Sequence, residues 1–361
     1  MQKHLKLLEE LKNKKTTIFF RVDSGTDVGY GHFVRCVALA LVLSKTYKII
    51  FITRYLKGNL IQSLNEKSFS IKKLSYTSKK INQVKDANET ISIIKKLSNK
   101  KNILIVDSYN LSEKWEKKIK LNIDKLIVID DLTTRKHICD MIIDQNLHSS
   151  MKNLYKDKIP KNCIKLFGPE YVILRNQFIK ERRFSSIRSL PIKKVLISFG
   201  GSDKENYTMS ALHFLKNFEH NFKIFVVVGK ANSKKNSIRN FCLKNSNFKY
   251  FEQIENMAKL MKNSDICIGS SGTTTWERCC LGLPGITVVS SMDQYDIAKA
   301  VSAKNCIINL GTTKPNKINF RKIFLNLTNN DLKSMSKNSM KLVDGKGSLR
   351  IEKSIVKNFG R

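Results

Sequence analysis

The first stretch with catalytic potential runs from Phe19 to Leu43, FFRVDSGTDVGYGHFVRCVALALVL. It begins as an apolar strand, turns through three glycines and continues as an apolar helix, with His32 at the bend. Imidazole titrates near ~6.5 and is the usual general base at neutral pH. Asp23 and Asp27 lie in the same turn, and either can orient the ring as the third group of a triad does. The alternative is a histidine that caps the helix beside two solvated turn aspartates.

The glycines of this turn favour function over a simple helix cap. Glycine lets the backbone pass close to a ligand, and Gly29 and Gly31 both precede the histidine closely. The first N–H groups of the helix then point toward the same ligand. We therefore expect Gly29, Gly31 and Asp23 to bind substrate, and His32 and Asp27 to act in catalysis.

A second glycine turn, FGGSDKENYT, follows an apolar strand and precedes a helix. Gly200 and Gly201 in that position resemble an anion-binding nest. Ser202 supplies a hydroxyl, and Asp203 is the expected N-cap of the helix. The alternative is a tight strand-to-helix turn with no ligand.

A third loop, IGSSGTTTWERCCLGLPG, is rich in hydroxyl groups and opens another helix. Backbone N–H and hydroxyl groups in such a loop bind phosphate oxygens. Glu277 lies one turn inside the helix, too far along to bind phosphate, and can accept hydrogen bonds from two ribose hydroxyls. The alternative is an N-capped packing helix, with Glu277 in a surface salt bridge. The expected phosphate ligands are Ser271, Gly272, Thr273 and Thr274.

Together the three loops suggest a diphosphate held between two domains by helix ends, with no need for a metal. The sequence contains no HExxH or GxxxxGK[ST] motif. Asp130 and Asp131 end a strand and are the alternative ligands for a cation. We expect neither a metal nor a cofactor.

The elements that position these loops alternate between strand and helix along most of the chain, which predicts βαβ units and parallel sheets. The predicted class is α/β: two Rossmann-like domains, their parallel sheets flanking an inter-domain cleft. We expect an N-terminal domain over 1–180, with an extension at 1–16, and a linker at 181–193. A C-terminal nucleotide-binding domain is expected over 194–345, and a last helix at 346–361 that packs back on the first domain.

The bulk composition excludes several other classes of protein. The chain has 361 residues, is 41% hydrophobic and carries a net charge of +36. Most of its 66 basic residues are lysines spread along the whole length rather than a cluster of arginines, so we expect no nucleic-acid partner. The run CVALALVL is far shorter than the ~20 residues of a membrane helix, so no stable membrane insertion is expected. Eight cysteines without a CxxC pair fit a reducing compartment, and we expect a cytoplasmic monomer or weak oligomer.

Several blocks, in content and order, resemble those of the PseG family. They are RVDSGTDVGYGHFVRCVALA, VDSYNL, VIDDL, DQNL, FGPEYVILRNQF, FGGSD and GTTTWERCCLGLP. Members of this family are UDP-2,4-diacetamido-2,4,6-trideoxy-β-L-altropyranose hydrolases of pseudaminic acid biosynthesis, and are similar to the MurG-type glycosyltransferases of GT-B fold. The resemblance covers roughly Thr17 to Val301.

The resemblance implies a reaction and roles for individual residues. Water would attack the anomeric carbon of a UDP-sugar without a metal, releasing UDP and the free sugar with inversion. His32 matches the family's base, and Tyr109 would lie near the sugar. Four further residues would bind the substrate: Ile254 and Met257 at the uracil, Glu277 at the ribose, and Gln294 at the sugar or diphosphate.

Two rival functions remain open at this point. A glycosyltransferase of the same fold would use a UDP-sugar donor and release UDP only when an acceptor is present. A non-catalytic nucleotide or nucleic-acid binder would show salt-dependent oligonucleotide binding.

Overall fold

The computed structural model describes residues 16–78, 80–97, 100–148, 151, 153–218 and 222–360. The expected extension at 1–16 lies outside these residues, apart from Thr16. The chain divides into two compact units, and each is described here by itself. The first contains described residues up to 146, residues 151 and 153–175, and residues 347–360; the second contains 147, 148 and 176–346.

The first unit is built on a seven-stranded sheet in the order β3-β2-β1-β4-β5-β6-β7, and every strand pair is parallel. Its strands are β1 (Thr16–Arg21), β2 (Lys48–Thr53), β3 (Ser70–Lys73), β4 (Lys101–Val106), β5 (Lys125–Ile129), β6 (Met141–Asp144) and β7 (Ile164–Phe167). The strand order reverses between β1 and β4. Ligands of open parallel sheets bind beyond the carboxyl ends of the strands at such a switch point.

Helices cover both faces of this sheet, because successive side chains of a strand point to opposite faces. Ile18 and Phe20 of β1 pack with the apolar side of α2 and with α14, whereas Phe19 packs with the cluster around Trp115 of α5. The helical elements are α2 (Gly31–Leu43), α3 (Gln62–Asn65), α4 (Gln83–Leu97), α5 (Glu113–Lys120), the 3-10 turn η1 (Pro169–Tyr171) and α14 (Gly347–Phe359).

The second unit repeats the same plan with a six-stranded parallel sheet in the order β10-β9-β8-β11-β12-β13. Its strands are β8 (Lys194–Ser198), β9 (Lys223–Val228), β10 (Phe248–Glu252), β11 (Ile266–Ser270), β12 (Gly285–Val288) and β13 (Ile307–Asn309). The switch point of this sheet lies between β8 and β11, so the loops after those strands are the expected ligand loops.

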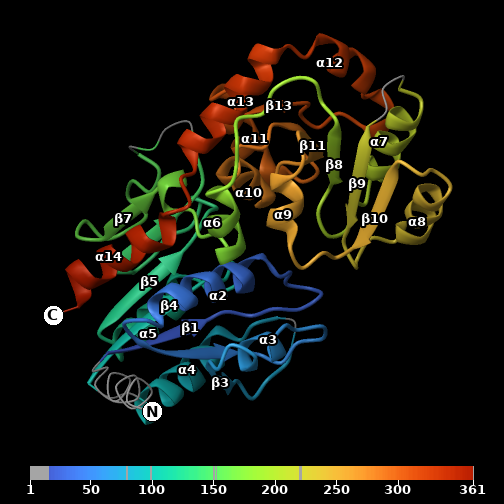
Figure 1. Cartoon of the computed structure of the whole chain (residues 1–361). Helices are drawn as coiled ribbons and strands as arrows, with labels where there is room; N and C mark the ends of the chain where they lie inside the picture. Colours follow the sequence, from blue (N-terminus) through green and yellow to red (C-terminus); the bar gives the residue numbers. More distant parts are fainter. Residues whose placement is uncertain are drawn as a thin grey trace, which may run out of the picture. The chain divides into compact units, whose positions relative to one another are not determined.

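Ten helical segments accompany the second sheet in the described part of the chain (Figure 1). They are α6 (Asn176–Arg182), α7 (Tyr207–Lys216), α8 (Lys235–Leu243), α9 (Met257–Lys262), α10 (Thr274–Cys280), η2 (Met292–Gln294), α11 (Tyr295–Ala303), η3 (Pro315–Lys317), α12 (Phe320–Asn326) and α13 (Asn329–Leu342).

The segment 181–193, predicted as a linker, belongs to the second unit in this structure. Its Arg188 is buried and donates hydrogen bonds to the backbone carbonyls of Ser186, Lys262, Ser264 and Leu281. The basic, serine-rich composition that indicated a linker thus includes an arginine that ties the segment to its own unit. The chain passes between the units earlier, at 175–176.

The C-terminal helix α14 belongs to the first unit and contacts α2 and η1 there. Ile351, Ile355 and Phe359 are buried in the same apolar cluster as α2. A side chain at Gly347 would place its Cβ 2.2 Å from the carbonyl oxygen of Val172, so the start of α14 packs directly on backbone. From Phe320 onward the tail forms three helices, α12, α13 and α14.

The predicted α/β class with two parallel-sheet domains is confirmed. Within the residues that the structure describes, no helix is both long and apolar enough to cross a bilayer.

Candidate functional site

The glycine turn after β1 is closed by backbone hydrogen bonds and leads into α2. Gly29 donates a backbone hydrogen bond to the carbonyl oxygen of Gly25 at 2.9 Å, and Gly29 has φ +77°. Thr26 donates to the carbonyl oxygen of Lys57 at 3.0 Å, which ties the loop to the segment after β2. A side chain at Gly31 would meet no atom within 4 Å, so the backbone there is open to a ligand.

His32 lies in the first turn of α2, and its side chain is 20% exposed. Its Nδ1 atom is 2.5 Å from Oδ1 of Asp107, the residue that follows β4. Burial alone would raise the pKa of Asp107, but Arg35 and His32 hold that pKa well below the usual range of an aspartate. An ionised carboxylate can only accept, so this contact requires the proton on Nδ1; in the neutral ring Nε2 is then the acceptor.

Arg35, one turn further along α2, fixes the carboxylate that holds the histidine. It donates to both oxygens of Asp107, at 2.6 and 2.7 Å, and to Asp131 at 2.8 Å. The guanidinium is buried, which alone would lower its pKa, but the two carboxylates raise that pKa well above its ordinary value. Arg35 therefore stays charged, and Asp107 cannot rotate away from the imidazole.

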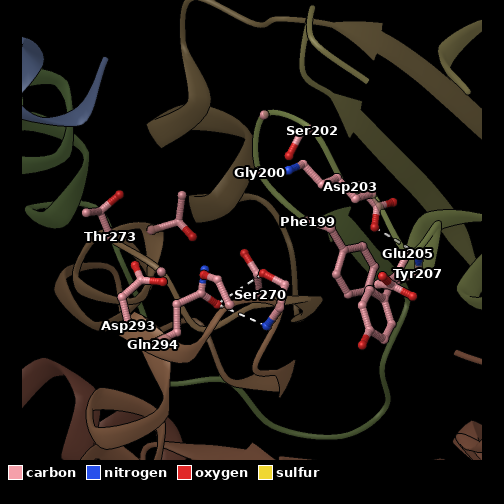
Figure 2. A pocket seen from close by; sticks show the side chains of 16 residues that line it. Phe199, Gly200, Ser202, Asp203, Glu205, Tyr207, Ser270, Thr273, Asp293 and Gln294 are labelled. Carbon is pink, nitrogen blue, oxygen red and sulfur yellow. Dashed lines mark hydrogen bonds between the residues drawn. The ribbon is translucent and has the colours of Figure 1, made fainter. Parts of the chain in front are cut away.

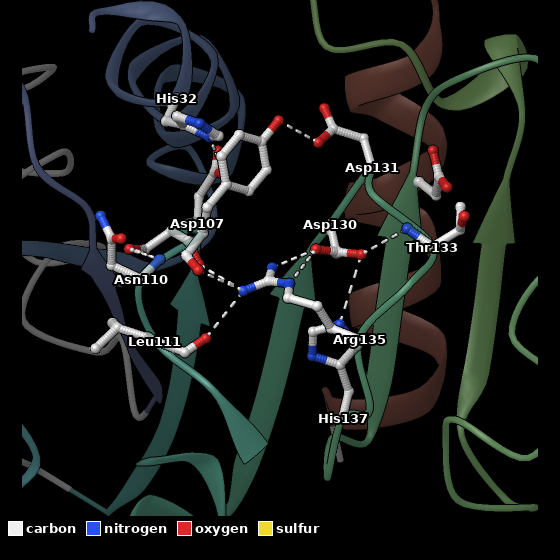
Figure 3. A network of polar contacts seen from close by, with 12 residues as sticks. His32, Asp107, Asn110, Leu111, Asp130, Asp131, Thr133, Arg135 and His137 are labelled. Carbon is white, nitrogen blue, oxygen red and sulfur yellow. Dashed lines mark hydrogen bonds and ion pairs between the residues drawn. The ribbon is translucent and has the colours of Figure 1, made fainter. Parts of the chain in front are cut away.

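Tyr109 completes this cluster, in the loop that follows Asp107. Its ring stands edge-on to the imidazole of His32, with 4.5 Å between the ring centroids. Its hydroxyl donates to Asp131 at 2.5 Å, a contact that Figure 3 draws. Desolvation of the phenol and the Asp131 carboxylate raise the pKa of Tyr109 well above its usual range. The side chain keeps 44% of its surface exposed, so it is accessible to a ligand.

The two aspartates predicted to orient His32 do not do so, and this corrects the sequence-based prediction. Asp23 is buried, and its oxygens accept hydrogen bonds from Arg21 and Arg54. Burial would raise the pKa of Asp23, but Arg21 and Arg54 lower it. Asp23 thus joins the ends of β1 and β2 rather than facing the bend. Asp27 is exposed in the turn, and Asp107 occupies the position against the imidazole.

A second ion-pair network lies beside the first and carries His137. This imidazole is 3% exposed, with Nδ1 2.7 Å from Glu116 and Nε2 3.5 Å from Asp130. Burial lowers its pKa, but Asp130 and Glu116 outweigh burial and raise the pKa of His137 to about 9. His137 is therefore an imidazolium at neutral pH.

The raised pKa of His137 makes the stability of the first unit depend on pH. The unfolded histidine titrates near ~6.5, so this contribution is fully present below ~6.5 and is lost as pH rises through about 9. As pH rises from ~6.5 to about 9, we expect the free energy of unfolding to fall in the parent protein. This fall should exceed the fall in the His137→Gln variant by on the order of 3 kcal/mol. The comparison uses urea unfolding in a Trp276→Phe background, where Trp115 reports the first unit alone. Equal pH slopes for the two proteins would contradict the charged state of His137.

The second unit contains a pocket of about 460 Å³ at the switch point of its sheet. The loops after β8, β11 and β12 line it, and these are the counterparts of the loops that hold His32 and Asp107 in the first sheet. Figure 2 shows Ser202 and Asp203 on one side and Asp293 and Gln294 on the other. Seven predicted ligands line this pocket: Gly200, Gly201, Ser202, Gly272, Thr273, Thr274 and Gln294.

The walls of this pocket consist largely of backbone and hydroxyl groups. Gly200 has φ +81°, a conformation that favours glycine. Asp203, the predicted N-cap of this helix, accepts hydrogen bonds from the N–H groups of Tyr207 and Thr208, but the N-cap position of α7 itself is Asn206. Among the described lining residues, Lys204 is the only basic side chain. Six serine and threonine residues line the pocket: Ser202, Ser270, Thr273, Thr274, Ser290 and Ser291.

A buried cation lies beneath one wall of the pocket. The guanidinium of Arg278 is almost fully buried and donates twice to the carbonyl oxygen of Ser270, at 3.1 Å. It also donates to the hydroxyl of Thr275 at 2.9 Å. Arg278 therefore fixes the β11–α10 turn and places a positive charge close to a pocket whose lining also includes the carboxylates of Asp203, Glu205 and Asp293.

Four predicted ligands in the second unit do not line this pocket. Ser271 is fully buried, and its hydroxyl donates to Thr287 at 2.9 Å, so the structure assigns it to the core rather than to phosphate. Glu277 is half-buried on α10. Ile254 and Met257 lie in the loop after β10 and at the start of α9.

Across the described residues, no group of three or more histidine, cysteine, aspartate or glutamate side chains is arranged to hold a metal ion.

Comparison with known proteins agrees with this architecture. Residues 195–354 match the model of the glycosyltransferase family 28 C-terminal domain. The chain has the fold of MurG from Acinetobacter baumannii, with a TM-score of 0.64, 14% identity and coverage of 95% of this chain and 99% of that one. This likeness defines a GT-B fold and nothing finer.

Two relatives resemble the chain in sequence. An uncharacterized protein of Methanocaldococcus jannaschii is 31% identical over 74% of this chain, and the match spans 54% of the relative's length. The chain thus corresponds to about half of that relative. The UDP-2,4-diacetamido-2,4,6-trideoxy-β-L-altropyranose hydrolase of Campylobacter jejuni is 28% identical over 73% of this chain and 88% of its own length.

Proposed function

We propose that the protein hydrolyses a UDP-sugar of the 2,4-diacetamido-2,4,6-trideoxyhexose class at its anomeric carbon, as a step in the synthesis of pseudaminic acid. The observation that carries this proposal is the arrangement of His32, whose Nδ1 is bound by an ionised Asp107 while its ring remains partly exposed. The hydrolase name of the Campylobacter jejuni relative gives the substrate class.

In the proposed reaction, Nε2 of His32 takes a proton from water as the water oxygen attacks the anomeric carbon. Asp107 accepts the Nδ1–H hydrogen bond and stabilises the imidazolium that forms. The bond between the anomeric carbon and the β-phosphate oxygen breaks, and UDP leaves with that electron pair. Attack opposite the leaving group inverts the configuration.

This reaction does not need the second carboxylic acid of most glycoside hydrolases. UDP is already a good leaving group, so protonation of the departing oxygen is dispensable. Positive dipoles and hydrogen-bond donors near the diphosphate stabilise the charge that develops on it. In our proposal these come from Gly200, Gly201 and the hydroxyls of Thr273 and Thr274.

Other substrate contacts in the proposal rest on the family resemblance. Tyr109 would contact the sugar, and Gln294 the sugar or diphosphate. Glu277 would accept hydrogen bonds from the ribose, and Ile254 and Met257 would contact the uracil. A cytoplasmic location is also part of the proposal, supported by eight cysteines that are all free thiols.

A glycosyltransferase is the second candidate, because the C-terminal match is to a glycosyltransferase domain. A product assay with purified protein separates the candidates. UDP-2,4-diacetamido-2,4,6-trideoxy-β-L-altropyranose is incubated with and without sugar or lipid acceptors, and products are followed by NMR. Hydrolysis gives equal amounts of UDP and free sugar without an acceptor, whereas a transferase releases UDP only when an acceptor is added. If UDP is released neither with nor without an acceptor, the protein binds a nucleotide without catalysing either reaction.

The positive φ of Gly200 gives a test of the nucleotide pocket. An alanine at φ +81° is strained by about 1–2 kcal/mol, and the turn must shift to relieve it. We expect Gly200→Ala to weaken UDP binding about tenfold in calorimetry, which corresponds to about 1.4 kcal/mol.

Gly311→Ala is the matched control for this variant. Gly311 also has positive φ, +62°, and open space around its Cβ position, but it does not line the pocket. The Gly311→Ala variant should lose about as much stability as Gly200→Ala and should keep its affinity for UDP. Equal affinity losses in both variants would show that the effect is general strain rather than damage to the pocket.

A further inference from the structure

Arg135 is a charged residue outside the catalytic cluster. Its guanidinium donates hydrogen bonds to the loop that bears Tyr109. One nitrogen, Nη1, donates to the carbonyl oxygens of Ser108, Tyr109 and Leu111, at 3.2, 3.0 and 3.1 Å. The side chain is 19% exposed. A single guanidinium thus gathers three carbonyls of one four-residue turn.

Contacts of the turn at 108–111 itself also hold its shape: Tyr109 bonds Asp131, and Leu111 is buried in the core. The hydroxyl of Ser108 accepts a hydrogen bond from the N–H of Asn110 at 3.2 Å, which closes the turn from within. The carbonyl oxygens of Ser108, Tyr109 and Leu111 converge at one point, where their partial charges repel one another. The positive charge of Arg135 offsets this repulsion and keeps the turn folded.

Arg135 is itself held in place from the opposite side. Its Nε donates to Asp130 at 3.0 Å, and its Nη2 forms an ion pair with the same carboxylate. Asp130 also accepts from Tyr155 at 3.0 Å and lies beside His137. Burial would raise the pKa of Asp130, but His137 and Arg135 lower it well below its usual range. Figure 3 shows Arg135 between Asp130 and Leu111.

We propose that Arg135 is a positioning residue that acts through Tyr109. The guanidinium fixes the backbone on both sides of Tyr109, and its carbon lies 5.7 Å from the centroid of the tyrosine ring. Tyr109 in turn stands against His32. The kinetic part of this inference rests on the proposed hydrolase activity, whereas the structural part does not.

The test uses Arg135→Lys, which keeps the charge but loses the fork that reaches several carbonyls and Asp130 together. Amide hydrogen exchange of the segment 108–111 should rise at least tenfold. In the hydrolysis assay kcat should fall about tenfold, with UDP inhibition unchanged. Because Arg135 acts through Tyr109, the double variant with Tyr109→Ala should be no slower than Tyr109→Ala alone. Arg135→Gln is the second variant if the lysine variant does not fold.

Arg182→Lys is the matched control. Arg182 likewise donates to three backbone carbonyls, those of Met340, Val343 and Cys280, but within the second unit. Its variant should leave exchange at 108–111 and the effect of Tyr109→Ala unchanged.

The two readouts separate this inference from the proposed function. If amide exchange at 108–111 is faster in Arg135→Lys but the parent protein hydrolyses no UDP-sugar, the positioning role is supported and the proposed hydrolase activity is contradicted. Unchanged exchange at 108–111, or fully additive losses for Arg135→Lys and Tyr109→Ala, would overturn the positioning role even if hydrolysis is demonstrated.

Discussion

Replacing His32 by alanine should lower kcat for UDP-sugar hydrolysis by about 10²–10⁴-fold, the range that a positioned general base contributes. In the described site, the imidazole of His32 can take a proton from water through Nε2 while Asp107 holds its Nδ1. Binding of UDP should not change, because the pocket that we assign to UDP lies in the other unit. Steady-state kinetics and calorimetry with UDP measure the two effects separately.

His213→Ala is the matched control for this substitution. His213 is an exposed histidine of α7 that does not line the pocket. It should retain full activity. If His32→Ala kept kcat within a few fold of the parent protein, another group would have to be the base.

Replacing Asp107 by asparagine should lower kcat by at least about 10²-fold with little change in KM. The amide has nearly the shape of the carboxylate but is neutral, so it neither stabilises an imidazolium nor fully balances Arg35. It can also present its NH₂ group to Nδ1, which selects the tautomer whose Nε2 carries the proton and cannot act as a base.

The control for Asp107 is Asp23→Asn. Asp23 is also buried between arginines but does not contact His32. We expect this variant to lose stability, measured by urea unfolding, while kcat changes by less than about threefold. A large loss of kcat in Asp23→Asn with none in Asp107→Asn would show that Asp23, and not Asp107, orients the imidazole of His32.

Much of the fold could be predicted because each element carried its own local signal. The apolar runs of β1, β2, β4 and β5 and the apolar helix α2 are visible in the sequence. The second half repeated the same alternation, which predicted the second sheet. The boundary between the units was not predictable from composition, because the hydrogen bonds of Arg188 depend on carbonyls 74 and 93 residues away.

The histidine of the site was predicted, but its partner was not. Asp107 is 75 residues from His32, and the sequence shows it only as an aspartate at the end of an apolar strand. The strand order brings them together, because β4 lies directly beside β1. Arg35 offered a local signal, since residues three apart on a helix share a face. Asp23 and Asp27 were the nearer carboxylates in sequence, and nearness alone favoured them.

The phosphate loops illustrate a different limit of sequence reasoning. Thr273 and Thr274 line the pocket, whereas Ser271 in the same hydroxyl-rich run is buried against Thr287. A run of serines and threonines gives no period from which to tell inward from outward side chains. Ser290 and Ser291 were missed because they follow β12, a strand that became adjacent to β11 only in the folded sheet.

The central claim is that water attacks the anomeric carbon of a UDP-sugar. The measurement that tests it most directly is turnover in ¹⁸O-labelled water, followed by mass spectrometry of both products. The account predicts one ¹⁸O atom in the released sugar and none in UDP. Label in the β-phosphate of UDP would place the attack at phosphorus, and no release without an acceptor would make the protein a transferase or a binder; either result contradicts the account.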